Sequence, residues 1–227
     1  MFLTPVSLSV MRIKNAMIKF NHIHLNFNGK IIIQNLSFEV KHGEKVVLIG
    51  KSGSGKSSLL GLLLGFIEPS KGKIFFEGIR VDKKSAWYVR KKVAYIDQDV
   101  SIGDGKVLDL LNFVSKLKTN KSLDFNISKV NGLFCDFELS NDTINQDLEN
   151  LSGGERQRLA IVISILLERN IFLLDEVTSS LDKPLKKKVT DYFVERENCT
   201  CLVISHDSIW LDNPAVKVFD VEEGKWR

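Results

Sequence analysis

The segment at 50–57, with the sequence GKSGSGKS, constrains the fold of this chain more than any other stretch. It fits the phosphate-loop pattern G-x-x-x-x-G-K-[ST]. An apolar run at 46–49 precedes it, and a helix-like stretch at 58–64 follows it. Strand, glycine turn and helix is the context in which this pattern binds phosphate. We therefore predict a nucleotide-phosphate site rather than a glycine-rich surface turn.

The residue types in this segment explain how it would bind an anion. Glycines let backbone N–H groups crowd around an oxyanion, and a helix N-terminus adds positive potential. The Lys56 ammonium can reach the β- and γ-phosphates, and the Ser57 hydroxyl can ligate Mg²⁺. The residues expected around the phosphates are Gly50, Lys51, Ser52, Gly53, Ser54, Gly55, Lys56, Ser57 and Ser58.

Length and composition limit the class of protein. A chain of 227 residues with 44% hydrophobic and 26% charged residues suits one α/β domain, with or without an inserted subdomain. The net charge of +4 is too small to indicate nucleic acid, so no nucleic-acid partner is expected. Three cysteines are too few for a disulfide framework, which favours a reducing compartment.

Membrane and targeting signals in the sequence are weak. The longest apolar run, 159–167, is interrupted by Ser164 and falls short of the ~20 residues that span a bilayer. No basic residue precedes the weakly apolar first residues, as a signal peptide would require. We expect a soluble, intracellular protein with an N-terminal extension at 1–16 and a single domain at 17–227.

Hydrophobic periodicity and turn residues predict two kinds of strand. Half-buried strands at 18–27 and 36–40 around Asn28-Gly29, with a strand at 74–76, indicate an antiparallel sheet. Further strands are predicted at 46–49, 93–96, 171–174 and 202–204. The last two are continuous apolar runs, which suit a parallel sheet buried on both faces.

Helices are predicted between these strands and at a few further places. The predicted helices are at 85–92, 106–117, 130–137, 156–168 and 185–196. Residues 140–150 are polar and are interpreted as a loop, and a short hairpin is expected from residue 216 onward. Because the section 99–150 lacks the strand signals of its flanks, we interpret it as most of a helical insertion.

An acidic pair follows the apolar run at 171–174. Asp175 and Glu176 stand beyond its carboxyl end, where an open parallel sheet places its ligands. The aspartate can hold Mg²⁺, and the glutamate can polarise the water that attacks a γ-phosphate. The alternative is an acidic turn that closes a core strand. With a phosphate loop in the same chain, we interpret the pair as a Walker B pattern that favours hydrolysis.

The segment LSGGE at 151–155 has a structural and a functional interpretation. Ser152 and Glu155 have the spacing of a capping box, in which each side chain accepts from the other's backbone N–H. Gly153 and Gly154 leave N–H groups bare beside the serine hydroxyl, so the same helix start can receive an anion. The two interpretations are compatible.

With these motifs in order, the sequence resembles the ATP-binding subunits of ATP-binding-cassette (ABC) transporters from about residue 17 onward. Besides the motifs above it has a Q-loop glutamine, Gln98, a D-loop at 179–182 and a switch histidine, His206. The resemblance implies an α/β P-loop NTPase (RecA-like) fold. Its parallel sheet core would carry an antiparallel β subdomain and an inserted helical subdomain at about 99–165.

The resemblance also implies a role for each residue around the bound ATP. Lys56 would hold the β- and γ-phosphates together with the loop amides, and Glu176 would be the general base. Gln98 would sense the γ-phosphate, and His206 would contact it. The residues that would complete the Mg²⁺ site are Ser57, Gln98 and Asp175.

Other matched residues are implied to act across a dimer interface. Ser152 and Gly154, in a segment with Gly153 and Glu155, would contact the γ-phosphate of ATP held by a second protomer. Asp182 would link the two sites.

Two positions depart from the commonest form of the motifs. Phe27 stands where family members place an aromatic residue, more often Tyr, on the adenine ring. The alternative for Phe27 is an ordinary apolar strand residue. Ser180 stands where the D-loop usually has Ala, and this exchange of small residues is expected to change little.

The implied assembly is a dimer, expected to be a homodimer, around two ATP molecules. It would drive a separate membrane permease from the cytoplasmic face of the membrane. The alternative is a non-transport ABC ATPase that acts on ribosomes or DNA, but these usually carry two cassettes or a long coiled coil. LSGGE and the absence of Asn-Lys-x-Asp argue against a kinase or GTPase. The sequence does not identify the transported cargo. The short insertion and the residues at 175–179 resemble those of small two-subunit exporter cassettes, but they also resemble those of many other exporters.

Overall fold

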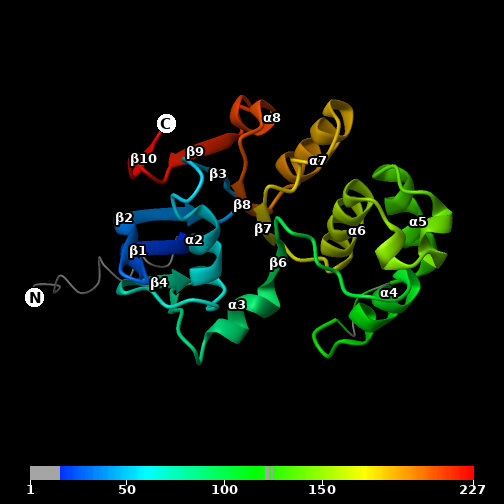
Figure 1. Ribbon diagram of the computed structural model, residues 1–227, viewed down its shortest axis with the longest axis horizontal. Coiled ribbons are helices and arrows are strands. Elements are labelled where there is room, and N and C mark those ends of the chain that lie inside the picture. The colour runs from blue at the N-terminus through cyan, green and yellow to red at the C-terminus, as the bar shows by residue number, and fades with distance from the viewer. Residues whose placement is uncertain (1–15, 121–122, 124) are drawn as a thin grey trace, which may run out of the picture.

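The computed structural model describes residues 16–120, 123 and 125–227 (Figure 1). The N-terminal extension expected at 1–16 lies outside the described residues except for Ala16, which begins the first strand. The antiparallel sheet lies at one end of the molecule, and helices α4 (Val107–Lys116) and α5 (Ile127–Asp136) lie at the other (Figure 1).

A six-stranded sheet forms the centre of the fold, with the order β10-β9-β3-β8-β7-β6. Its strands are β3 (Lys45–Ile49), β6 (Val93–Ile96), β7 (Ile171–Asp175), β8 (Thr200–Ile204), β9 (Val216–Asp220) and β10 (Lys225–Trp226). All neighbours are parallel except β9 and β10, which form a hairpin. The predicted parallel core and closing hairpin are confirmed.

Both faces of this sheet are covered, which explains the continuous apolar runs in its strands. Along β3, Val47 and Ile49 pack on one face in a cluster with helices from the segment between β6 and β7, whereas Val46 and Leu48 pack on the other face. The second face meets α2 (Lys56–Leu63) and the antiparallel sheet.

The antiparallel sheet has the order β2-β1-β4-β5. Its strands are β1 (Ala16–Phe27), β2 (Lys30–Lys41), β4 (Lys71–Phe76) and β5 (Ile79–Arg80). Asn28 and Gly29 have φ values of 50° and 81° and join β1 to β2, as the Asn-Gly pair predicts. Phe38 stacks on Phe20 of β1 and on Phe219 of β9, which ties this sheet to the central one.

The remaining helices agree with the predicted positions to within a few residues, except α8, which has no predicted counterpart. They are α3 (Ala86–Lys92), α4 (Val107–Lys116), α5 (Ile127–Asp136), α6 (Gly153–Leu166), α7 (Lys183–Glu195) and α8 (Ser208–Leu211). No helix among the described residues has both the length and the apolar character that crossing a bilayer requires.

Two boundaries differ from the sequence prediction. The predicted loop at 140–150 contains two short 3₁₀ helices, η1 (Asn141–Asn145) and η2 (Leu148–Asn150). They form because the otherwise polar segment buries Ile144 and Leu148. Helix α6 starts three residues before the predicted position 156, because the capping box at Ser152 closes its first turn.

The sheet order brings the predicted motifs to one edge. β3, β8, β7 and β6 are successive parallel neighbours, so their carboxyl ends lie side by side. The segments that follow them carry the phosphate loop, His206, Glu176 and Gln98, respectively. This edge is where open α/β sheets bind ligands.

Candidate functional site

A cavity of about 570 Å³ opens at this edge and is lined by residues from all four segments. The predicted site residues that line it are Phe27, Ser52, Gly53, Gly55, Lys56, Ser57, Ser58, Gln98, Asp175, Glu176 and His206. Leu25, Ile32, Ile67 and Ile204 complete the lining. Residues separated by up to 181 positions in sequence, from Leu25 to His206, thus share one cavity.

Two glycines of the phosphate loop are required by its geometry. Gly50 has a φ of 145° and Gly55 a φ of 93°, which L side chains rarely adopt. A Cβ on Gly50 would lie 2.7 Å from Ser54 Oγ, and one on Gly55 would lie 2.8 Å from Ile33 Cγ1. A side chain at either position would therefore strain the backbone and collide with a neighbour.

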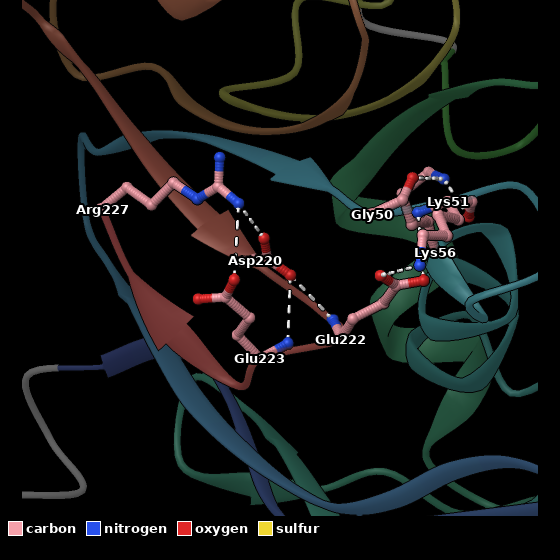
Figure 2. Close-up of polar contacts among 7 residues, drawn as sticks. All are labelled: Gly50, Lys51, Lys56, Asp220, Glu222, Glu223 and Arg227. Atoms are coloured by element: carbon pink, nitrogen blue, oxygen red, sulfur yellow. Dashed lines mark hydrogen bonds and ion pairs between the residues drawn. The ribbon is translucent and has the colours of Figure 1, made fainter.

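The start of α2 offers positive groups to this cavity. Gly55 is the N-cap of α2 and supplies no side-chain cap, so the first amides of the helix stay available to an anion. The Lys56 ammonium is buried and donates to the carbonyls of Gly50 (2.6 Å) and Lys51 (2.9 Å), as Figure 2 shows. The loop itself therefore holds the cation that a phosphate would meet.

Asp175, the last residue of β7, is a buried carboxylate with an unusual environment. It is 1% exposed, and neither of its oxygens has a hydrogen-bond partner among the described residues. Burial raises its pKa above the ordinary value, and the neighbouring Ser57 hydroxyl opposes the increase. The charges of Asp97 and Glu176 add to the increase, and that of Lys56 opposes it.

These residues fit a bound Mg²⁺. A buried carboxylate with two unpartnered oxygens is costly, and a cation would satisfy it. Asp175 stands beside the Ser57 hydroxyl and shares the cavity with the Gln98 amide, so the available donors are all oxygens. When bound, the ion would neutralise phosphate charge.

We expect Asp175→Asn to raise the unfolding midpoint of the nucleotide-free protein while weakening Mg²⁺ binding. The neutral amide is less costly to bury than an unpartnered carboxylate. A gain of about 1 kcal/mol corresponds to about 2–4 °C in a domain of this size. Because burial raises the pKa of Asp175, the gain should shrink as the pH falls and this carboxyl becomes protonated. Calorimetry checks this, and a midpoint below that of the wild type would contradict it.

Glu176 follows β7 in a strained backbone conformation. Its φ is 51°, which is uncommon for a residue with a side chain. Its N–H donates to the Ile204 carbonyl at 3.0 Å, so the backbone is anchored to β8. The His206 Nε2 atom lies 3.7 Å from Glu176 Oε1, and the two side chains flank the same end of the cavity.

Gln157 is a residue near the site that sequence reasoning missed. It lies on α6, is 3% exposed, and its Nε2 donates to the Glu176 carbonyl at 3.1 Å. Its Oε1 accepts a hydrogen bond from the Ser180 hydroxyl. Ser180 therefore makes a contact that Ala could not make, so the expectation that this exchange changes little does not describe its environment. The strained backbone of Glu176 is held from both sides.

Part of the cavity lining is apolar and includes Phe27. This side chain is 59% exposed at the end of β1, and Leu25, Ile32 and Ile67 line the cavity beside it. An exposed aromatic ring beside apolar lining residues offers a flat surface to a planar ligand.

The signature residues, which are the LSGGE segment at 151–155, lie outside this cavity. Ser152 caps α6 and forms a capping box with Glu155, as the spacing predicts. Ser152 donates from both its hydroxyl (2.7 Å) and its backbone N–H (2.8 Å) to Glu155 Oε2, which lowers the pKa of Glu155. Ser152 and Gly153 are exposed, and Gly154 is half-buried. Asp182 is likewise exposed and caps α7 by accepting from Leu185 N–H at 3.0 Å.

Comparisons with known proteins agree with this geometry. The family model for ABC transporters matches residues 33–179. The lactococcin-G-processing and transport ATP-binding protein of Lactococcus lactis is 34% identical over 198 residues, which cover 85% of this chain and 28% of that protein. The energy-coupling factor transporter ATP-binding protein of Mycoplasma pneumoniae is 29% identical over 221 residues, which cover 93% of this chain and 78% of that protein.

A solved structure shares the fold. The structure of a bacterial Atm1-family ABC exporter with ATP bound matches with a TM-score of 0.80 at 21% identity, covering 94% of this chain and 38% of that one. The chain spans about a third of the length of several curated relatives that it matches. The family model covers more than half of the chain. The chain therefore belongs to the ABC transporter family, whose ATP-binding domains are ATPases.

Proposed function

We propose that the chain hydrolyses ATP at a site that a second protomer completes. The observation that carries this proposal is the separation of the motif residues. The phosphate loop and Glu176 line one cavity, whereas Ser152 and Gly154 lie at an accessible helix start outside it. A second copy arranged head to tail would bring that helix start over the phosphates, where its N–H groups would meet negative charge.

In the proposed reaction, Glu176 accepts a proton from the water that attacks the γ-phosphate. The bond from this phosphorus to the bridging oxygen breaks, and ADP and phosphate result. His206 stands beside the glutamate and would contact the γ-phosphate, and Gln98 would sense it from the end of β6. Lys56 would leave the loop carbonyls for the β- and γ-phosphate oxygens.

The signature helix, which is α6, would bind the γ-phosphate of the ATP held by the other protomer. The Ser152 hydroxyl now donates to Glu155, so it must turn away from this carboxylate to donate to a phosphate. Asp182 would link the two sites across the interface. Loss of the γ-phosphate by hydrolysis would remove the group that bridges the protomers, and the dimer would open.

We further propose that this opening drives a membrane permease on a separate chain. The helical segment between β6 and β7 would receive the permease, and the protein would lie on the cytoplasmic face of the membrane. Relatives named as export and energy-coupling proteins support a transport role without fixing the cargo. The same relatives favour transport over action on ribosomes or DNA, and the net charge of +4 is too small to argue for a nucleic-acid partner.

A dilution series tests the dimer proposal. We expect turnover per chain to fall as the protein is diluted below the concentration at which it dimerises, because a lone protomer lacks half of each site. Sizing of the same samples reports the fraction of dimer. Undiminished turnover per chain in a sample that sizing shows to be monomeric would contradict the proposal.

A further inference from the structure

The hairpin of β9 and β10 contacts the phosphate loop from the side opposite to β8. β9 pairs directly with β3, on the side away from β8. Asp220 at the end of β9 pairs with Ile49, the last residue before the loop. The Val221 N–H donates to the Ile49 carbonyl at 3.0 Å. The turn of the hairpin therefore begins level with the start of the phosphate loop.

Asp220 fixes the shape of this turn. It is 4% exposed, and its Oδ1 accepts from the backbone N–H groups of Glu222 and Glu223, both at 3.0 Å (Figure 2). The Arg227 guanidinium binds its other oxygen. The hydrogen bond from Glu223 and the other contacts hold the pKa of Asp220 below its ordinary value. The backbone that carries Glu222 is therefore held in one conformation.

The Glu222 side chain reaches from this turn to the phosphate loop. Its Oε1 accepts from the Lys51 backbone N–H at 3.3 Å, and its Oε2 lies 3.8 Å from the Lys51 ammonium (Figure 2). The Lys51 side chain is 87% exposed, so this ion pair contributes little. The contact with the backbone N–H is the one that can shape the loop.

Glu222 and Lys56 hold the same peptide group from opposite sides. The peptide between Gly50 and Lys51 is trans, so its carbonyl and its N–H point in opposite directions. The carbonyl accepts from Lys56 Nζ at 2.6 Å, and the N–H donates to Glu222. Because Gly50 has no side chain to restrict its rotation, these two contacts decide how the peptide is oriented.

We propose that Glu222 is a positioning residue that sets the phosphate loop for ATP. It orients the Gly50–Lys51 peptide so that the loop keeps its anion-binding shape when Lys56 leaves the carbonyls for the phosphates. A loop that is already held in this shape loses less conformational freedom when ATP binds, so its affinity for ATP is higher. The inference rests on the proposed function, because it assumes that ATP binds in this loop.

The test compares three substitutions in the same turn by ATP binding and steady-state kinetics. Glu222→Ala removes the acceptor, and we expect the Kd and KM for ATP to rise about tenfold with kcat within about twofold of the wild type. Glu222→Gln keeps an acceptor oxygen without the charge, and we expect a Kd within about twofold of the wild type. Glu223→Ala is the matched control, because its side chain lies 3.8 Å from Arg227 and forms no hydrogen bond or ion pair with the loop residues that the structure describes.

Each outcome decides the question. Unchanged affinity in Glu222→Ala, with an unfolding midpoint equal to that of the wild type, would overturn the inference. Equal weakening in the Ala and Gln variants would also overturn it, because the charge would then be the cause. Tighter ATP binding in both would show that the carboxylate only repels phosphate, and would overturn it as well. A wild-type protein that binds no ATP would instead refute the proposed function.

Discussion

Glu176→Gln is expected to lower ATP turnover by about 10²–10⁴-fold while ATP still binds. The amide cannot accept the proton of the attacking water, but it has nearly the same size as the carboxylate. The backbone contacts of Glu176 with Ile204 and Gln157 do not involve the substituted group, so the strained turn should keep its shape. Because hydrolysis is needed to open the proposed dimer, this variant should accumulate as an ATP-bound dimer on a sizing column.

Glu168→Gln is the matched control for this variant. Glu168 also has a φ of 51°, but it follows α6 and pairs with Lys129 of α5, away from the cavity lining. We expect it to turn over ATP like the wild type. Turnover in Glu176→Gln close to that of Glu168→Gln would remove Glu176 from the role of general base.

Lys56→Ala is expected to weaken ATP binding by at least about 30-fold, which corresponds to about 2 kcal/mol for the loss of one partner of a buried charge pair. Lys56 is 8% exposed, and it is the only lysine or arginine among the described residues that line the cavity. Without it, the phosphates would depend on the loop amides and the N-terminus of α2. Titration with ATP measures the loss.

Lys129→Ala is the matched control, because it removes a lysine that lies away from the cavity. Its ammonium pairs with Glu168 on the helical segment, and it does not line the cavity. We expect ATP affinity equal to that of the wild type. An affinity in Lys56→Ala within threefold of this control would mean that Lys56 does not bind the phosphates.

The sequence predicts the parts of this fold whose signals are local. The phosphate loop, the Asn28-Gly29 turn and the capping box at Ser152 each depend on residues within a few positions of one another. The loops that follow the parallel strands are expected to lie close together, because parallel strands present their carboxyl ends at one edge of a sheet. The structure therefore places the predicted loops together around one cavity.

The contacts that hold these loops in place could not be predicted in the same way. Gln157 reaches the Glu176 carbonyl from 19 positions away, and Glu222 reaches Lys51 from 171 positions away. Neither contact leaves a periodic or compositional signal, since it depends on how far one side chain extends from a separate element. The helices η1 and η2 were missed because two apolar side chains anchor an otherwise polar segment.

The central claim, that each site is shared by two protomers, can be tested by mixing two variants that each damage a different half of the site. Lys56→Ala damages the phosphate loop, and Gly154→Asp places a negative charge where a phosphate would approach the signature helix. An added Cβ on Gly154 would lie 3.8 Å from the Ser180 carbonyl, an ordinary contact, so this variant should fold.

In a mixed dimer, one site would combine both damaged halves and the other would combine both intact halves. Random pairing in an equal mixture makes half of the dimers mixed, so about a quarter of the sites should be intact. We expect ATP turnover to reappear on mixing at up to about this fraction of the wild-type rate. A mixture as inactive as its two parents, under conditions in which sizing shows mixed dimers, would contradict the shared site.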